Sequence, residues 1–294
     1  MKLSVVIPVY NDPGGIDATL QSVVAQDHAT YEVIPVDNNS TDETSAMIQE
    51  WAERHPDRIR PVAERGRQSS YAARNAGVRA ADGEIVVFID ADMTAPTDWL
   101  RRVEEAFTAT SIDYLGYEVE TYVPDGNEGF WGWYDSVMGL PSRYHFEQKQ
   151  FVPTACLAVR RAVFGRVGLF DDRARSGGDK EFGQRVHRHP DLTQGFRGDI
   201  VVYHPARTTF DAHRKKAVRV GRGLARLAEP LDADGRRVLL ELLLHAVPPD
   251  PRRIRRRAPD CTSLQLLSLY VANMLLRYVR LGGAVSHFFR KDLA

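Results

Sequence analysis

The sequence predicts an α/β fold: a mainly parallel sheet with helices on both faces, followed by a helical, basic C-terminal extension. Short apolar runs alternate with helix-like segments up to residue 207, an order typical of parallel sheets. The charge divides the chain at about the same place. Residues 205–294 contain 18 Lys and Arg against 8 Asp and Glu, whereas residues 1–204 contain 21 against 31. We therefore expect two electrically different bodies.

The strands of the sheet are short apolar runs bounded by turn residues, and the helices show apolar residues at helical spacing. In chain order we expect a strand at 3–7, a turn at 11–15, a helix at 16–25, a strand at 33–36, a helix capped by Ser40 or Asp42 that ends near Arg54, a weak strand at 59–62, a helix at 70–81, a strand that ends at Asp90, a strand at 154–159, a helix opened by 176–182 and a strand at 200–204.

An acidic motif, Asp90-Ala91-Asp92, ends the most apolar of these strands. Alternate residues of a strand share a face, so both carboxylates can point into one site. Ligands of parallel sheets bind beyond the carboxyl ends of the strands, where Asp12 and Asp37 also fall. Carboxylate oxygens suit a hard divalent cation, although an Asp-x-Asp alone is about as often a solvated strand end.

Composition fits a soluble enzyme with one large core and an appendage, since 43% of the 294 residues are hydrophobic. The two cysteines, Cys156 and Cys261, lie far apart without metal-ligand spacing, which fits a reducing compartment. The run after Lys2 is interrupted at Pro8, too early for a secretory signal. We expect a cytoplasmic protein, or one bound peripherally to the inner face of the cell membrane.

Four motifs, in this order and spacing, resemble the nucleotide-sugar half of family-2 glycosyltransferases with the GT-A fold: VIPVYN at 6–11, VDNNSTD at 36–42, ARNAG at 73–77 and FIDAD at 88–92. The resemblance covers residues 1–207. It implies a catalytic domain with a nucleotide-sugar half (1–95) and an acceptor half (96–207), and leaves 208–294 as a helical extension.

The resemblance implies a donor site for a nucleoside-diphosphate sugar. Pro8 and Tyr10 can wall a planar base, and Asp37 can accept a hydrogen bond from a base imide N–H. Uracil is favoured, although guanine also offers such a group. The implied donor-binding residues are Pro8, Tyr10, Asn11, Asp37, Arg74, Asn75, Asp90 and Ala91. Alternatively, Asp37 stabilises a helix N-terminus and Arg74 forms an ordinary surface pair.

The same resemblance implies a metal site. Asp90 would touch the ribose or the metal, and Asp92 would ligate a metal that bridges the diphosphate. His204 resembles the late histidine that completes this site in many GT-A enzymes, and imidazole with carboxylate suits Mn²⁺ as well as Mg²⁺. A lone histidine is more often structural, so that alternative stays open.

A glycine-flanked acidic turn at 176–182 resembles the acceptor-side motif of the family, usually written Glu-Asp. Here Gly178 replaces the first acid, which leaves Asp179 as the match to the catalytic base. Such a base takes the proton from an attacking acceptor hydroxyl. Alternatively, Asp179 and Glu181 merely cap the helix that follows.

Aromatic residues gather between 126 and 151, where the family has its variable acceptor region. They can stack on sugars or lipid, or simply fill a core. The aromatic residues are Phe130, Trp131, Trp133, Tyr134, Tyr144, Phe146 and Phe151.

The C-terminal extension combines charge and apolar stretches. Basic residues between Arg214 and Arg226 recur at helical spacing, and apolar stretches at 238–247 and 264–276 flank a basic, proline-rich segment at 248–257. Each stretch is shorter than the ~20 residues that span a bilayer. The stretches can pack on the catalytic domain, form a homodimer or lie peripherally on a membrane; packing or oligomerisation is favoured over membrane contact.

These observations predict a metal-dependent inverting glycosyltransferase that moves a sugar from a nucleoside diphosphate, preferably UDP, to a hydroxyl of a glycan or lipid-linked acceptor, with Mn²⁺ or Mg²⁺ as cofactor. The alternatives are a non-catalytic nucleotide-sugar-binding protein and a sugar nucleotidyltransferase, although no triphosphate loop rich in glycine and basic residues follows the first strand. A dinucleotide oxidoreductase lacks its Gly-x-Gly-x-x-Gly, and the basic tail contains no nucleic-acid-binding motif.

Overall fold

The computed structural model describes residues 1–174, 176–229 and 233–291. The chain forms two compact units. The first contains residues 1–122, 140–174 and 178–205, and the second contains 123–139, the short stretch that ends at Gly177, and the chain from 206 onward. The boundary predicted after residue 207 lies close to the end of the first unit, and the structure adds residues 123–139 to the second.

The first unit is built on a seven-stranded sheet with the order β3-β2-β1-β4-β6-β5-β7. The pairs β1–β2, β1–β4, β2–β3 and β5–β7 are parallel, whereas β6 is antiparallel to both neighbours. The predicted mainly parallel sheet is therefore confirmed. The strands are β1 (Leu3–Val9), β2 (Tyr31–Asp37), β3 (Val62–Ala63), β4 (Ile85–Phe88), β5 (Tyr114–Tyr122), β6 (Leu157–Arg160) and β7 (Gln194–Pro205).

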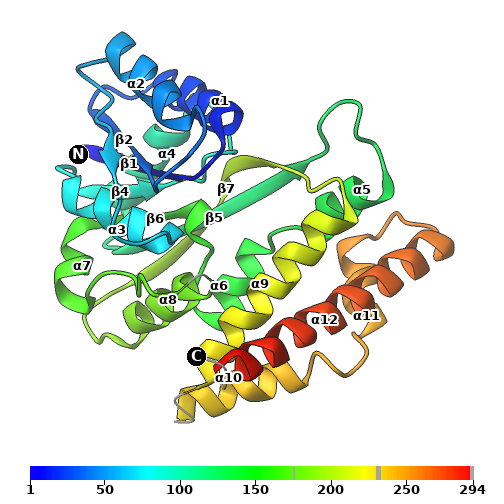
Figure 1. Ribbon diagram of the computed structural model, residues 1–294. Coiled ribbons are helices and arrows are strands. Elements are labelled where there is room, and N and C mark those ends of the chain that lie inside the picture. Colours follow the sequence, from blue (N-terminus) through cyan, green and yellow to red (C-terminus); the bar gives the residue numbers. More distant parts are fainter. Residues whose placement is uncertain (175, 230–232, 292–294) are drawn as a thin grey trace. The chain divides into compact units, whose positions relative to one another are not determined.

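Helices cover both faces of this sheet. In Figure 1, α1, α2 and α4 lie over one face, and α3, α7 and α8 lie over the other. The helices of the first unit are α1 (Pro13–Val24), α2 (Thr44–Arg54), α3 (Ser70–Ala80), α4 (Trp99–Ala109), α6 (Ser142–Lys149), the 3₁₀ turn η1 (Thr154–Cys156), α7 (Arg161–Val167) and α8 (Gly178–Arg188).

The central strands explain why this unit folds. Every residue of β1, β2 and β4 is buried, as expected for parallel strands covered on both faces. Helix α1 begins with Pro13, and the Asp12 carboxylate accepts a hydrogen bond from the Gly15 N–H at 2.9 Å. The residues directly after β1, β2 and β4 are thereby held at the edge of a rigid sheet.

Some element boundaries differ from the sequence prediction. The weak third strand forms at β3, and Ile59 makes only an isolated bridge to Val33. The predicted strand at 154–159 begins as the 3₁₀ turn η1, and only its second half joins the sheet as β6. Strand β7 begins six residues earlier than predicted, because it pairs with the whole length of β5.

The second unit is helical, as predicted for the C-terminal extension. Helices α9 and α12 pack closely: a Cβ at Gly221 would come within 2.0 Å of the Arg280 carbonyl oxygen, and one at Gly283 within 2.6 Å of that of Val218. Within the described ranges, none of the helices combines the length and apolar character needed to span a bilayer. The helices are α5 (Phe130–Met138), α9 (Phe210–Ala228), α10 (Ala233–Leu243), α11 (Pro251–Arg257) and α12 (Ser263–Lys291).

Candidate active site

The loops that follow β1, β2 and β4 leave the sheet at one edge, because β1 is hydrogen-bonded to both other strands. Asn11 joins the first two loops: its side chain accepts a hydrogen bond from the Thr41 N–H at 2.8 Å and donates to the Thr41 hydroxyl at 3.2 Å. Asn11 has a φ of 50°, a conformation that asparagine tolerates. This residue therefore shapes the edge at which a donor would bind.

Asp37, the last residue of β2, is buried at this edge. Its Oδ1 accepts a hydrogen bond from the Ser40 N–H at 2.9 Å. Its Oδ2 accepts no hydrogen bond from the described residues and lies 3.3 Å from Nη2 of Arg65. Asp37 and Arg65 also line a cavity of about 150 Å³ between α2 and β3. A buried acceptor oxygen beside a cavity suits a ligand N–H, and sequence reasoning did not identify Arg65.

The other residues implied for the base and sugar differ in exposure. Pro8 is buried within β1, whereas Tyr10, just beyond the strand, is 47% exposed. Ala91 is buried, and a Cβ at Gly15 would lie 2.6 Å from its carbonyl oxygen. Tyr10 is therefore the one of these three predicted residues with a side chain open to a ligand.

Arg74 of α3 forms an ion pair with Asp90 in the loop after β4. The distance from Nη2 to Oδ1 is 2.5 Å, and the arginine side chain is only 5% exposed while that of Asp90 is 36% exposed. Nε of Arg74 is buried and makes no hydrogen bond within the described part of the chain. The pair therefore keeps the guanidinium buried and leaves the Asp90 carboxylate accessible at the site.

Asn75, the neighbour of Arg74, is occupied by the protein itself. Its side-chain amide donates to the Phe170 carbonyl at 2.9 Å, and its side-chain oxygen accepts the Phe170 N–H at 3.1 Å. The Ser69 hydroxyl likewise donates to the Ala174 carbonyl at 2.7 Å. These bonds fix the segment that leads to α8, so a contact of Asn75 with the nucleotide stays a prediction.

Asp92 and His204 face each other although they are far apart in sequence. Thr94 and Tyr203 exchange two backbone hydrogen bonds of 3.0 and 2.8 Å, which hold the loop after β4 against the end of β7. Nε2 of His204 lies 3.6 Å from Oδ2 of Asp92. Nδ1 of His204 contacts the Pro205 carbonyl at 2.6 Å, and this contact requires a proton on Nδ1. The other ring nitrogen, Nε2, then faces Asp92.

Asp179 lies in the first turn of α8, partly buried against α3. Its Oδ1 accepts hydrogen bonds from the Tyr71 hydroxyl at 3.2 Å and from the Lys180 N–H at 2.9 Å. Burial raises the pKa of Asp179, while the Lys180 N–H, the charge of Arg74 and the Tyr71 hydroxyl oppose that rise. The result is a carboxylate with increased basicity.

Glu181, two residues on, is engaged elsewhere. Its two oxygens accept hydrogen bonds from Nε and Nη2 of Arg185 at 2.5 and 2.9 Å. Both oxygens of Glu181 are thus already bound within the protein by a bidentate ion pair. Asp179 is therefore better prepared for proton transfer than its neighbour.

The aromatic segment divides between the two units. In the second unit, Trp131 contacts Tyr134, Phe210 and His213 with ring centroids 5.2 to 5.6 Å apart. In the first unit, the Phe146 ring packs on Phe196 at 5.4 Å. Part of the segment thus fills cores, while Phe130 and Tyr144 are 40% and 45% exposed.

Tyr71 is the main site residue that sequence reasoning missed. It lies in a helix, and no neighbouring residue in the sequence indicates a functional site. Its hydroxyl hydrogen-bonds Asp179, which is 108 residues further along the chain. The glycine that precedes Asp179 was the available signal: a Cβ at Gly178 would lie 2.9 Å from Cε2 and Cζ of the Tyr71 ring.

Comparison with solved structures gives the fold of this protein. A mannosyltransferase from Pyrobaculum calidifontis, in complex with GDP-Man and Mn²⁺, aligns with a TM-score of 0.65 at 20% identity, covering 98% of this chain and 87% of that one. S. aureus TarS, residues 1–349, in complex with UDP-GlcNAc, aligns with a TM-score of 0.56 at 17% identity, covering 99% and 92%. The fold is that of GT-A glycosyltransferases, as predicted.

Sequence comparison then gives the family. The model of glycosyl transferase family 2 matches residues 4–168. The glycosyltransferase AglE of Haloferax volcanii is 30% identical over 99% of this chain and 97% of its own length. An undecaprenyl-phosphate 4-deoxy-4-formamido-L-arabinose transferase of Proteus mirabilis is 31% identical over 40% of this chain and 35% of its own. This chain belongs to glycosyl transferase family 2, and it is a glycosyltransferase that uses a nucleotide sugar.

Proposed function

We propose that this enzyme is a metal-dependent, inverting glycosyltransferase that transfers a sugar from a nucleoside diphosphate, preferably UDP, to a hydroxyl of a glycan or lipid-linked acceptor. The Asp92–His204 pair carries the proposal. A carboxylate opposite an imidazole nitrogen is a donor set that suits Mn²⁺ or Mg²⁺.

The residues fit such a metal. Within the described ranges, no cluster of three or more histidine, cysteine or acidic side chains is arranged to hold an ion. Two protein ligands leave the other coordination positions to water and substrate phosphates, which is the usual arrangement for Mg²⁺. When bound, the metal would neutralise the charge of the diphosphate leaving group.

The remaining chemistry falls to the side chains of this chain. Asp37 would accept a hydrogen bond from the base, and Arg74 would hold Asp90 beside the ribose. Asp179 would accept the acceptor's proton while the acceptor oxygen bonds to the anomeric carbon and the bond to the diphosphate breaks. One base and one displacement invert the anomeric centre. The raised pKa of Asp179 supports this role.

Two points of the proposal rest on different support. UDP is preferred because the Asp37 carboxylate could accept a hydrogen bond from the imide N–H of uracil. The two structural neighbours carry GDP-Man and UDP-GlcNAc respectively. A lipid-linked acceptor is supported by the undecaprenyl-phosphate transferase among the relatives. With such an acceptor the C-terminal helices would contact a membrane, whereas a homodimer would cover them with a second copy of the chain.

The proposal is tested on the full chain by a thermal-shift screen of UDP-, GDP- and dTDP-sugars, each with EDTA, Mg²⁺ or Mn²⁺. Because a ligand stabilises the state that binds it, the true donor should raise the melting temperature only with metal present. Release of nucleoside diphosphate is then measured under the same conditions. Donor binding and turnover that survive EDTA unchanged would refute the metal-dependent mechanism.

A further inference from the structure

Helix α12 is apolar on two sides. On one side Leu269, Ala272 and Leu276 are 0%, 5% and 7% exposed and belong to the core of the second unit. On the other side an exposed row recurs every three or four residues, with a gap at Gly282. The row consists of Leu264, Leu267, Val271, Leu275, Tyr278 and Val285, which are 43% to 73% exposed. A helix with apolar residues on two sides normally packs both sides against apolar partners.

The end of α10 and the turn after it extend this exposed row. The carbonyl oxygens of Leu244 and Val247 accept hydrogen bonds from Nη2 of Arg277, the latter at 2.9 Å. Leu244 and Val247 are themselves 52% and 55% exposed, and Leu240 and Leu243 are both 59% exposed. These residues and the α12 row together form an exposed apolar surface, and folded monomers rarely leave a large contiguous apolar surface uncovered.

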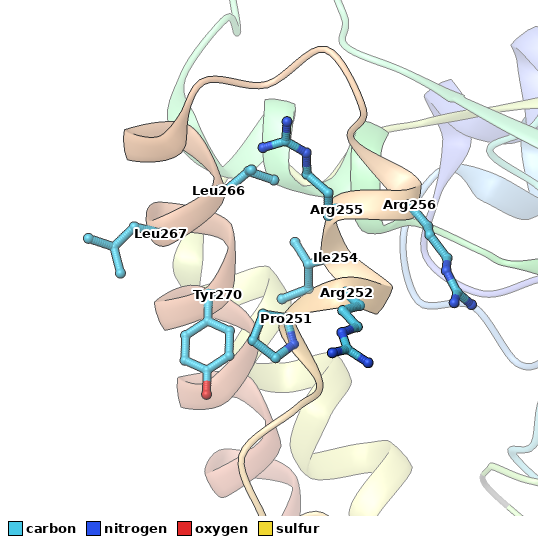
Figure 2. A pocket seen from close by; sticks show the side chains of 8 residues that line it. All are labelled: Pro251, Arg252, Ile254, Arg255, Arg256, Leu266, Leu267 and Tyr270. Atoms are coloured by element: carbon cyan, nitrogen blue, oxygen red, sulfur yellow. The ribbon is translucent and has the colours of Figure 1, made fainter.

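A groove of about 700 Å³ opens between α11 and the start of this row. Its apolar lining consists of Pro251, Ile254, Leu266, Leu267 and Tyr270. Figure 2 shows Pro251 and Ile254 facing α12, while the guanidinium groups of Arg252, Arg255 and Arg256 extend away from α11. The groove therefore combines a hydrocarbon lining with a rim of positive charge.

The charge around the groove is predominantly positive, although Asp250 and Asp260 flank α11. Helix α11 carries five arginines, and α12 contains no acidic residue from Ser263 to Lys291. Arg252, Arg253, Arg255 and Arg256 are exposed, and no carboxylate of the described residues forms an ion pair with them. Guanidinium groups bind phosphate oxygens well, and basic helices with an apolar face lie in the headgroup region of membranes.

We propose that the α12 row and the α11–α12 groove dock the enzyme on the surface of a bilayer that contains anionic phospholipid. The arginines of α11 bind the lipid phosphates, and the apolar side chains enter the region below the headgroups. A second copy of the chain is the less suitable occupant. A two-fold interface brings the same patch of each subunit together, and here it would bring the uncompensated arginines of α11 to the same interface.

The proposal goes beyond the proposed function and is tested without donor or metal. The full chain is sedimented with vesicles of phosphatidylcholine alone and of phosphatidylcholine mixed with phosphatidylglycerol, at low and at high salt. Binding should require phosphatidylglycerol and weaken with salt, because screening reduces attraction between exposed charges. Absence of binding to the mixed vesicles, or equal binding to both kinds, overturns the proposal.

Two sets of variants locate the surface. Arg252→Gln/Arg256→Gln should weaken partitioning about 25-fold, since each basic residue near an anionic surface contributes about fivefold. Leu267→Ser/Val271→Ser should weaken it about tenfold or more by removing exposed apolar area. Matched controls in the first unit are Arg54→Gln/Arg79→Gln and Tyr122→Ser, all at exposed positions.

The controls should bind vesicles like the unchanged protein. All variants change exposed side chains, so their melting temperatures should stay close to that of the parent, and a melting curve checks this directly. Equal losses in the controls would show that the surface lies elsewhere. A dimer in solution that the Leu267→Ser/Val271→Ser variant dissociates, without any vesicle binding by the parent, would identify a second copy as the occupant and overturn the proposal.

Discussion

The hydroxyl of Tyr71 lies 3.2 Å from Oδ1 of Asp179 and 3.3 Å from its backbone nitrogen, so that it donates to the carboxylate and accepts from the N–H. Burial raises the pKa of Tyr71, which keeps the hydroxyl protonated. The guanidinium of Arg74 lies 5.6 Å from the centre of the same ring. Tyr71 therefore fixes the proposed base at two atoms and connects it to the Arg74–Asp90 pair.

Tyr71→Phe removes this hydrogen bond and keeps the ring. The bond favours the charged form of Asp179, so its loss should raise the pKa of Asp179 further. A base must be deprotonated, and turnover falls as the pH falls through its pKa. The acidic limb of the kcat profile should therefore move to higher pH by about one unit. An unmoved limb would show that Tyr71 only fills space.

Gly178→Ala tests why glycine stands where the family usually has an acid. The new Cβ would lie 2.9 Å from the Tyr71 ring, which must shift and carry its hydroxyl away from Asp179. We expect lower kcat and a loss of about 1–3 kcal/mol in the free energy of unfolding. Gly165→Ala is the matched control, because no neighbouring atom would lie within 4 Å of its Cβ and alanine should stabilise the helix slightly. Normal kcat in Gly178→Ala would disprove the steric explanation.

The parts of the site that the sequence predicted depend on short patterns within the chain. An apolar run followed by an acid marks the end of a strand, as at Asp37, or the loop just beyond it, as at Asp90, which lies two residues after β4 and not at the strand end that the sequence predicted. Parallel strands bring such ends together. The antiparallel direction of β6 has no such signal, because an apolar run gives no information about whether its strand pairs parallel or antiparallel. The pairing of Arg65 with Asp37 also depends on how β3 is placed beside β2, which neither residue reveals in the sequence.

Residues 123–139 also could not be assigned to a domain from the sequence alone. The sequence assigns them to the acceptor half of the catalytic domain, yet the structure groups them with the C-terminal helices. Their aromatic side chains pack there: the Trp131 and Tyr134 rings each lie 5.3 Å from that of His213. A segment that pairs with residues some 80 positions away cannot be assigned from its own composition.

Asp92→Asn should abolish metal-dependent donor binding while the protein still folds, because the substitution keeps the volume and removes the charge of the proposed metal ligand, whose side chain is 41% exposed. His204→Ala should show a milder form of the defect, since water can take its place. The readout is the stabilisation of each variant by nucleotide sugar with Mn²⁺. Asp57→Asn, at an exposed position on the surface, is the control. Unchanged stabilisation of Asp92→Asn would remove Asp92 from the site.

Asp135→Ala should destabilise the second unit. Asp135 is buried and accepts hydrogen bonds from the N–H and Nη1 of Arg207 at 2.8 and 3.2 Å. Burial raises its pKa, but Lys216, the Arg207 N–H and the charge of Arg207 lower it more. Removing one partner of such a pair costs about 3–5 kcal/mol. Denaturant unfolding at neutral pH measures the loss.

The sign of the pH effect follows from the lowered pKa of Asp135. The stabilisation is present above the pKa of the unfolded carboxyl and is lost as the pH falls through the lower pKa of the folded one. The difference between parent and Asp135→Ala should therefore shrink only in acid, below the ordinary value of 3.8. Asp211→Ala, which removes an exposed partner of Arg214, should change stability by less than about 1 kcal/mol. A loss as large in this control would mean that burial is not the cause.

Asp179→Asn is the decisive change for the proposed mechanism. The amide keeps the size of the side chain and can still accept the Tyr71 hydrogen bond, but it cannot take a proton. We expect donor and metal affinity near those of the parent and a kcat lower by about 10²-fold or more. Glu181→Gln is the matched control, and because Glu181 is held by Arg185 it should keep most of its turnover. If Asp179→Asn retains its turnover instead, the base is another carboxylate, and Asp171 and Glu181 are then tested in the same assay.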